Sequence, residues 1–434
     1  MRGTRILVPA TALAALLPAL PAGAVDRLEY ATEEGEIRTA AVKAVIRETL
    51  KEFRARVLLG GRTRALKLPS RLIVSFRRGS RDDVNQWSKK LAGAYRLMRA
   101  GQLATKENVP GAEEVLQAIT FSTEPGTRGA EKEERVEPWH NMYALFHLIE
   151  VRYRIGVRQK NPDKLKQALD DIEQFRRRTE AKRRLKWKVP GEGGLRETRI
   201  HAWGSSWLWP HVILKKARVE RALGETAASS STYDSLVELA KREQLSPRLV
   251  ATAVLEKAEM DARDKGSDRA EAVYRAAGNR LRRDAGAQPD KYGQQTLREA
   301  ANRALLQGAD LLLKSAYDKQ VSFDVPLQRY RQLASGEGRR DPALNAGAQA
   351  GIGICLVEQG KGEEAYRALL WVVLHSYAHP AQVERSLYHL ARAADLYAAE
   401  VEGGGGNGEY LRRAGQRWRQ DLRERFPNSP WLTK

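Results

Sequence analysis

From Asp82 to the C-terminus, the chain repeats one pattern: amphipathic helical segments that alternate with short breaks rich in Gly, Pro, Asn and Ser. Apolar residues recur three and four positions apart within each segment, which predicts helices with one apolar face. Because the breaks are short, consecutive helices are expected to pair as hairpins, and each hairpin can bury its apolar face on the next. The pattern predicts a mainly α fold, a helical-hairpin solenoid over residues 82–434. An irregular helical bundle is the alternative.

The clearest hairpin runs from Asn345 to Pro380. Within it, bulky and small residues follow one another at set intervals: Ile352, Gly353, Leu356, Gly360 and Ala365. This order resembles the tetratricopeptide repeat (TPR), although Gln349 stands where the family has Trp and the closing proline falls late. The resemblance implies a TPR-like α–α superhelix, in which small residues let two helices approach and bulky residues fill the space between them. It also implies a non-catalytic scaffold whose concave face binds an extended peptide or a partner protein.

The first residues, Met1 to Ala24, have the pattern of a cleavable export signal. Arg2 and Arg5 precede an uncharged stretch rich in Ala, Leu, Val and Pro, and the small residues Ala22 and Ala24 end it. We expect cleavage after Ala24 and a periplasmic or secreted protein, with an uncleaved N-terminal anchor as the alternative. No later segment is long and apolar enough to predict a transmembrane helix.

Residues 25–80 read as a small β-rich module. Phe53 to Leu59 alternates apolar and basic side chains, which is typical of a half-buried strand, and Gly60-Gly61 separates it from a second run, Thr63 to Leu68. Ile37 to Leu50 fits either a strand or one face of a helix, and we favour the strand. The module resembles small β-barrel-like modules at the front of exported bacterial repeat proteins.

Two segments interrupt the helical pattern, near residues 123–137 and 179–210. The second combines a run of basic residues with a cluster of Trp, and insertions in solenoids often form the binding face. We take its side chains as a candidate contact surface, and the alternative is that the Trp rings fill a gap between two hairpins. The candidate binding residues are Arg176, Arg177, Arg178, Arg183, Arg184, Trp203, Trp207 and Trp209.

The chain is strongly basic, with 75 Lys and Arg against 54 Asp and Glu and a net charge of +21. These cations are spread over every helix, which is typical of solvated faces, and an exported protein is not expected to meet nucleic acid. The interpretation that best fits is a scaffold for protein–protein interactions in the bacterial cell envelope. The alternative is an envelope polysaccharide- or anionic-polymer-binding protein that uses the Trp/Arg-rich insertion.

Catalytic motifs are missing: the sequence contains no phosphate-binding loop, no metalloprotease motif and no nucleophile elbow. We therefore predict that the protein is not an enzyme and needs no cofactor. A cell-wall hydrolase is a third hypothesis, and it requires two carboxylates that face each other across a cleft.

No metal site is predicted. His375 and His379 are four residues apart and His389 is the nearest third ligand, but Pro380 indicates a helix boundary at the pair. His201 and His211 flank the Trp cluster and have no nearby partner in sequence. The single cysteine, Cys355, excludes an intrachain disulfide, and its apolar neighbours predict an inert buried thiol.

Overall fold

The computed structural model describes residues 26–48, 51–59, 62–77, 86–105, 110–121, 138–180, 185–188, 195–198, 207–263, 265–336 and 338–433. The chain divides into two compact units, Met1–Leu249 and Val250–Lys434. The candidate signal segment lies outside the described residues. The units differ from the domains expected from sequence, because the N-terminal sheet belongs to the same unit as the first helices.

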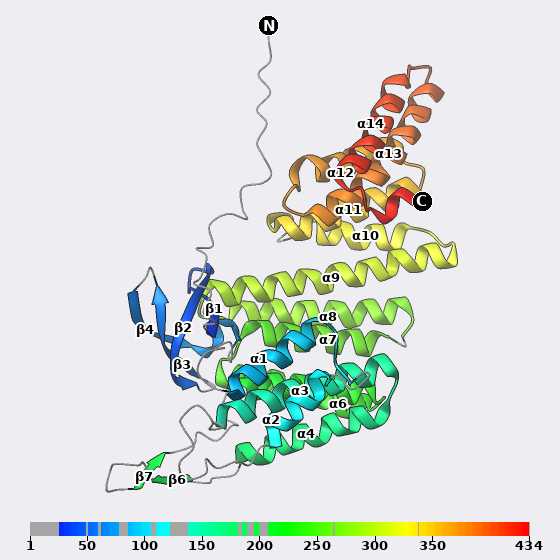
Figure 1. Ribbon diagram of the computed structural model, residues 1–434. Coiled ribbons are helices and arrows are strands. Elements are labelled where there is room, and N and C mark those ends of the chain that lie inside the picture. The colour runs from blue at the N-terminus through cyan, green and yellow to red at the C-terminus, as the bar shows by residue number, and fades with distance from the viewer. Residues whose placement is uncertain are drawn as a thin grey trace. The chain divides into compact units, whose positions relative to one another are not determined.

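A five-stranded antiparallel sheet opens the first unit, with the strand order β4-β3-β2-β1-β5 (Figure 1). In β3, Phe53, Ala55 and Val57 are buried while the side chains between them are not. This period of two is what places one face of a strand in a core. The strands are β1 (Asp26–Ala31), β2 (Ile37–Glu48), β3 (Glu52–Leu59), β4 (Arg62–Pro69) and β5 (Ile73–Arg77).

The ambiguous segment Ile37 to Leu50 forms strand β2 as far as Glu48, and the turn at Gly60-Gly61 lies outside the described residues. Strand β1 had not been predicted, because only Leu28 and Tyr30 alternate as apolar residues within its six positions. Tertiary pairing decides both cases: β2 lies between β1 and β3, and β1 lies between β2 and β5.

Among the helices of the first unit, α4 begins at a clear local signal. Asn161 accepts hydrogen bonds from the backbone N–H groups of Asp163 and Lys164, and Pro162 is the first helical residue, so the two-residue connection before α4 is a capped turn. The helices are α1 (Gln86–Arg99), α2 (Ala112–Phe121), α3 (Pro138–Gln159), α4 (Pro162–Glu180), α5 (Leu208–Ala222) and α6 (Thr226–Glu243).

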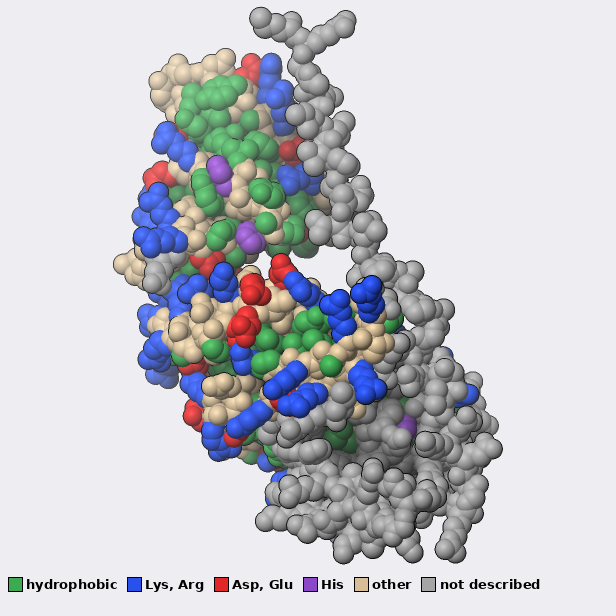
Figure 2. Space-filling view, turned by 90° about the vertical axis from the view of Figure 1, so that its left-hand side faces the viewer, with side chains coloured by type: hydrophobic (Ala, Val, Ile, Leu, Met, Phe, Trp, Pro, Cys, Tyr) green, Lys and Arg blue, Asp and Glu red, His purple; other side chains and the backbone are tan. Residues whose placement is uncertain are grey.

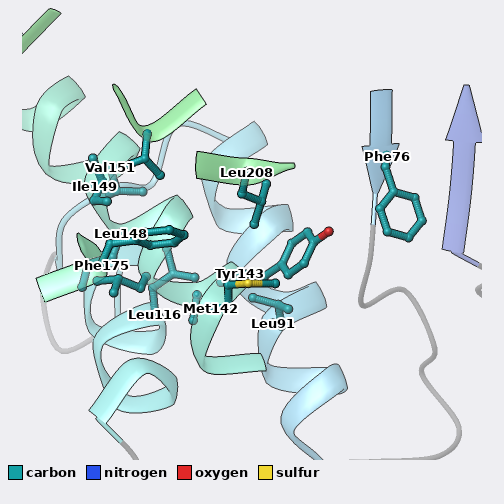
Figure 3. Close-up of a cluster of buried hydrophobic side chains, with 14 of the residues drawn as sticks. Phe76, Leu91, Leu116, Met142, Tyr143, Leu148, Ile149, Val151, Phe175 and Leu208 are labelled. Atoms are coloured by element: carbon teal, nitrogen blue, oxygen red, sulfur yellow. The ribbon is translucent and has the colours of Figure 1, made fainter. Parts of the chain in front are cut away.

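One apolar core joins the sheet of this unit to its helices. Phe76 of β5 contacts Phe53 of β3, with ring centroids 4.9 Å apart, and lies edge-on to Tyr143 of α3 at 6.5 Å. Figure 3 shows Tyr143 pointing toward Phe76, while Leu91, Leu208 and the other labelled side chains of the helices lie on the side away from Phe76. The sheet therefore packs as part of the helical unit.

The second insertion is shorter than expected, because α4 continues to Glu180 and α5 starts at Leu208. It contains a two-stranded antiparallel pair, β6 (Leu185–Lys188) and β7 (Leu195–Thr198), which the sequence did not predict. Lys186 and Lys188 look like part of the basic run in sequence, so the alternation of Leu185 and Trp187 with them did not lead to a predicted strand. Residues 123–137, the other insertion, lie outside the described residues.

The second unit is helical, and α7 begins just before its boundary. Asp290 and Asp341 cap the helices that follow them, accepting hydrogen bonds from the first backbone N–H groups. The helices are α7 (Pro247–Ala262), α8 (Ser267–Gly286), α9 (Lys291–Lys319), α10 (Asp324–Leu333), α11 (Pro342–Glu358), α12 (Gly362–His375), α13 (Pro380–Gly403) and α14 (Glu409–Arg425).

Helix α11 is buried along most of its length, because its small residues let three neighbouring helices approach. A Cβ at Gly347 would lie 2.6 Å from Leu306 of α9, and one at Gly351 would lie 2.4 Å from the ring of Tyr330 of α10. Gly353 meets α12 in the same way. Glycines thus let α11 pack closely against α9, α10 and α12.

The described part of the chain is mainly helical, with a small antiparallel sheet near its N-terminus and successive helices that pair as hairpins (Figure 1). The predicted fold class is confirmed. Among the described residues, no helix has both the length and the apolar character needed to cross a membrane.

Candidate ligand-binding site on helices α3 and α5

Two helices of the first unit, α3 and α5, bring polar and aromatic side chains together at regular intervals. On each helix these residues lie three or four positions apart, so they share one face. We call this group the α3–α5 cluster; it consists of Tyr143, His147, Glu150 and Arg154 on α3 and Trp207, His211, Lys215 and Arg218 at the start of and along α5.

The aromatic end of the α3–α5 cluster faces the sheet. The indole N–H of Trp207 donates a hydrogen bond to the hydroxyl of Tyr143 at 3.1 Å. The ring of Phe76 lies 6.4 Å from that of Trp207, and His211 contacts Trp207 edge-on with centroids 5.1 Å apart. These contacts fix the start of α5 against α3.

The charged centre of the α3–α5 cluster is an ion pair between Lys215 and Glu150. Both side chains are nearly buried, with 11% and 16% of their surface exposed. The ammonium also lies 4.6 Å from the centre of the Phe146 ring, and Arg154 donates to the same carboxylate at 2.6 Å. Burial would raise the pKa of Glu150, but Lys215 and Arg154 outweigh it and lower that pKa to about 2.

Two half-buried imidazoles flank the ion pair. Burial, followed by the charge of Lys215, lowers the pKa of His147 to about 3 and that of His211 to about 4, so both rings are neutral near pH 7. Burial also lowers the pKa of Lys215 itself. Perturbed groups gathered in one place are typical of functional sites.

The balance of charge in the α3–α5 cluster is positive. Arg154 and Lys215 supply two cations and Glu150 one anion, so 2 − 1 leaves +1 with both imidazoles neutral. Arg154 keeps 44% of its side chain exposed. The arrangement suits recognition of a carboxylate or another anionic group by guanidinium and ammonium donors next to aromatic rings. It does not hold the two facing carboxylates that a glycoside hydrolase requires.

The Trp residues of the insertion have structural contacts in the fold. Trp207 is half-buried through its contacts with Tyr143 and Phe76, and Trp209 is half-buried and stacks parallel to Phe175 of α4 at 6.1 Å. Trp203 lies outside the described residues. The two described rings therefore contact α3 and α4, as the alternative considered from sequence requires, and both keep part of their surface exposed.

The arginines expected to form a basic contact surface are only partly described. Arg176 and Arg177 are exposed on α4 and both pair with Glu173, whose pKa they lower to about 2. The side chain of Arg178, together with Arg183 and Arg184, lies outside what the structure describes. On the face in Figure 2, Lys and Arg side chains are interspersed with acidic and apolar ones over the described residues.

Five residues were expected to pack the hairpin of α11 and α12. Gly353 lies against Leu369, with a would-be Cβ at 2.4 Å from its Cγ, and Gly360 takes a left-handed φ of +74° in the turn. The other three residues of the pattern are buried: Ile352, Leu356 and Ala365.

The histidines considered as metal ligands are engaged elsewhere. His375 stacks on Trp371, and its Nδ1 lies 2.9 Å from that residue's backbone oxygen. His389 is buried against Tyr388 and Trp431. Within the described ranges, no group of three metal-ligating side chains comes together.

Cys355 is fully buried, and burial raises the pKa of its thiol to about 12. A thiol with so high a pKa is almost entirely protonated near pH 7, and the thiolate is the nucleophilic form. This environment agrees with the inert core thiol expected from its neighbours in sequence.

A second charged cluster, between α2, α3 and α4, is structural. Arg152 donates to both carboxylate oxygens of Asp171, at 2.9 and 2.8 Å, and to Glu113 at 3.0 Å, while Lys164 donates to Glu113 at 2.8 Å. Burial raises the pKa of Asp171 to about 6 against the opposing charge of Arg152. Each charge here has a partner inside the protein, so the cluster ties three helices together.

Sequence reasoning singled out Trp207 and His211 but missed the other six residues of the α3–α5 cluster. Glu150 and Lys215 are 65 positions apart, and each lies in a helix whose charges look like those of any solvated face. The one available signal was the matching spacing of polar residues on the two helices.

No family model matches the chain, and no curated protein matches it. Among solved structures, the apo form of RapI is 13% identical, covers 80% of this chain and 78% of its own, and has a TM-score of 0.39. BtubC from P. vanneervenii is 14% identical over 68% of this chain and 92% of its own, with a TM-score of 0.30. The Rap conjugation gene regulator of plasmid pLS20, in complex with a Phr peptide, is 13% identical over 78% and 94%, with a TM-score of 0.31. All three TM-scores lie below 0.5, so the similarity is loose.

Proposed function

We propose that this protein is a non-catalytic helical scaffold that binds a peptide or protein partner, and that the α3–α5 cluster holds an acidic side chain of that partner. The observation that carries the proposal is the excess of cations around the nearly buried pair of Glu150 and Lys215. Charge-assisted hydrogen bonds from guanidinium and ammonium groups are strongest where water is partly excluded.

Glu150 is central to how such a partner would bind. Its carboxylate accepts from Lys215 and Arg154, the same donors that an incoming carboxylate would use. An acidic side chain of the partner would share these donors, so the +1 excess of Arg154 and Lys215 over Glu150 would be neutralised.

The resemblance of the α11–α12 hairpin to a TPR supports the scaffold role, since proteins of that family bind peptides and proteins.

The export pattern of Met1 to Ala24 supports a place in the cell envelope for this scaffold. The length of the mature chain, measured by intact mass after expression in a bacterial host with its own signal peptidase, tests that location; a chain that retains Met1 in the cytoplasm contradicts it.

A charge-matched comparison tests the binding site. The double variant Arg154→Gln/Arg218→Gln removes two cations from the cluster, and Arg176→Gln/Arg177→Gln removes two exposed cations from α4. Each is used, beside the unaltered protein, to capture partners from envelope extract by cross-linking and mass spectrometry. Acidic peptides from any captured partner are then titrated by fluorescence anisotropy.

We expect the cluster variant to bind the acidic peptide at least about 100-fold more weakly, since it loses two charge-assisted bonds and each contributes roughly 1.5–3 kcal/mol. The α4 variant should bind like the unaltered protein. Equal losses in both variants would mean that net charge alone attracts the peptide, and that result would refute the assignment of the site.

A further inference from the structure

A hollow of about 480 Å³ lies on the first helical hairpin of the chain, between α1 and α2. Carbon atoms form almost all of its surface, from Gly93, Leu97 and Ala100 of α1 and Val115 of α2. Lys90 and Arg96 also line it, and both are exposed. It is separate from the α3–α5 cluster and shares no residue with it.

The hollow exists because two of the α1 residues that line it, Gly93 and Ala100, have little or no side chain. Lys90, Gly93, Leu97 and Ala100 are three and four positions apart, so they form one stripe along the helix. A Cβ at Gly93 would meet no atom within 4 Å, so packing does not require a glycine there. Glycine is among the least favourable residues in a helix interior, and its presence at an open position keeps the hollow unfilled.

Two of the side chains that line the hollow are cations, Lys90 and Arg96, and none is a carboxylate. Helix α1 has four cations and no acidic residue, a charge of +4, whereas α2 has Glu113 and Glu114 in its first turn. An apolar hollow beside several cations is complementary to a ligand with an apolar side chain flanked by carboxylates. An amphipathic helix with acidic residues on its rim presents that combination, and it fits a hollow bounded by two helices.

We propose that the hollow between α1 and α2 binds an apolar side chain from an acidic amphipathic helix of a partner protein. The apolar side chain lies against Leu97, Ala100 and Val115 over the space left by Gly93. Carboxylates one turn before and after it pair with Lys90 and Arg96. This is a second contact surface beyond the α3–α5 cluster.

Filling the hollow is the direct test. The full-length protein and its Gly93→Leu variant are titrated into a fluorescein-labelled helix-forming peptide of Leu, Ala and Glu, with Leu on one face only. We expect Gly93→Leu to weaken binding about 10- to 100-fold, the loss that matches exclusion of one buried Leu side chain. Lys90→Gln/Arg96→Gln should weaken binding and reduce its dependence on salt.

Three controls separate this site from general charge attraction. Gly286→Leu introduces the same side chain at an exposed position of α8 where a Cβ also meets nothing, and it should leave binding unchanged. A peptide of the same composition, with its Leu residues dispersed around the helix, should bind more weakly. Far-UV circular dichroism establishes that each variant keeps its helices.

Equal affinity of Gly93→Leu and the unaltered protein for the peptide would overturn the proposal. So would equal affinity for both peptides, because net charge alone would then explain binding. If laurate binds in a manner sensitive to Gly93→Leu while the peptide does not bind, the hollow is a site for small amphiphiles and the proposal is wrong. None of these results bears on Arg154 and Arg218, so the function proposed for the α3–α5 cluster is tested separately.

Discussion

Replacing Gly353 with Leu should destabilise the second unit, because a side chain at this position would collide with Leu369 of α12. A Cβ at Gly353 would lie 2.4 Å from the Cγ and 2.7 Å from the Cδ2 of Leu369. Leu369 is fully buried among other apolar side chains and has no open space to move into. The helices must therefore separate or Leu369 must leave its rotamer.

The expected loss in the free energy of unfolding is about 3 kcal/mol, the upper end of the range of about 1–3 kcal/mol for overpacked cores, because Leu adds a whole side chain. The matched control is Gly93→Leu, where a Cβ meets nothing within 4 Å. That change should be neutral or stabilising by up to about 1 kcal/mol, since Leu is a far better helix former than Gly. Urea unfolding followed by far-UV circular dichroism compares the two.

A double-mutant cycle identifies the contact responsible. Leu369→Ala alone should cost about 2–5 kcal/mol by leaving a cavity, and Gly353→Ala should cost less. The double variant Gly353→Ala/Leu369→Ala should lose less free energy of unfolding than the two single losses added together, by about 0.5–3 kcal/mol. The reason is that the new methyl group at position 353 enters the space that the Leu369 side chain vacates. Equal urea midpoints for Gly353→Leu and Gly93→Leu, or strict additivity in the cycle, would refute the close packing of α11 on α12.

Two further predictions concern the first unit. Arg152→Met should lower the free energy of unfolding by about 3–5 kcal/mol, because it leaves the buried carboxylates of Asp171 and Glu113 without their guanidinium, and a loss below about 1 kcal/mol in urea titrations would contradict this. The depressed pKa values of about 3 for His147 and about 4 for His211 keep the folded imidazoles neutral, so these two rings should lower stability on acidification from about pH 6.5, where unfolded histidine takes up a proton, toward pH 4. Asp171, whose pKa is raised to about 6, should offset part of that loss, because it takes up its proton in the folded state first. Between about pH 7 and pH 5, each ring should lower the free energy of unfolding by about 1 kcal/mol, which is half of the value for a fully buried imidazole because both rings are half-buried. The double variant His147→Gln/His211→Gln should therefore flatten the pH dependence of the urea midpoint.

Local sequence signals were sufficient to locate most helices and their ends. Asn161 and Pro162 start α4 by capping and by a preset φ, and Gly360 ends a helix in a left-handed turn that other residues rarely adopt. The small residues around Gly353 predicted close packing of the hairpin, because only a missing side chain lets two backbones approach. These properties depend on neighbours within a few positions of the chain.

The candidate site could not be predicted in this way. Glu150 and Lys215 lie on different helices, and neither residue is unusual in its own segment. Trp207 and Trp209 look like a binding platform in sequence, yet in the fold they pack against Tyr143 and Phe175.

The sequence by itself determined the helical class, the turns and the small-residue contacts within hairpins, because backbone preferences and apolar periodicity act over a few residues. Only the tertiary structure decided which charges share a face, which aromatic rings fill the core, and that β1 pairs between β2 and β5. Those outcomes depend on contacts between segments far apart in the chain, and a local pattern does not say which distant segments meet.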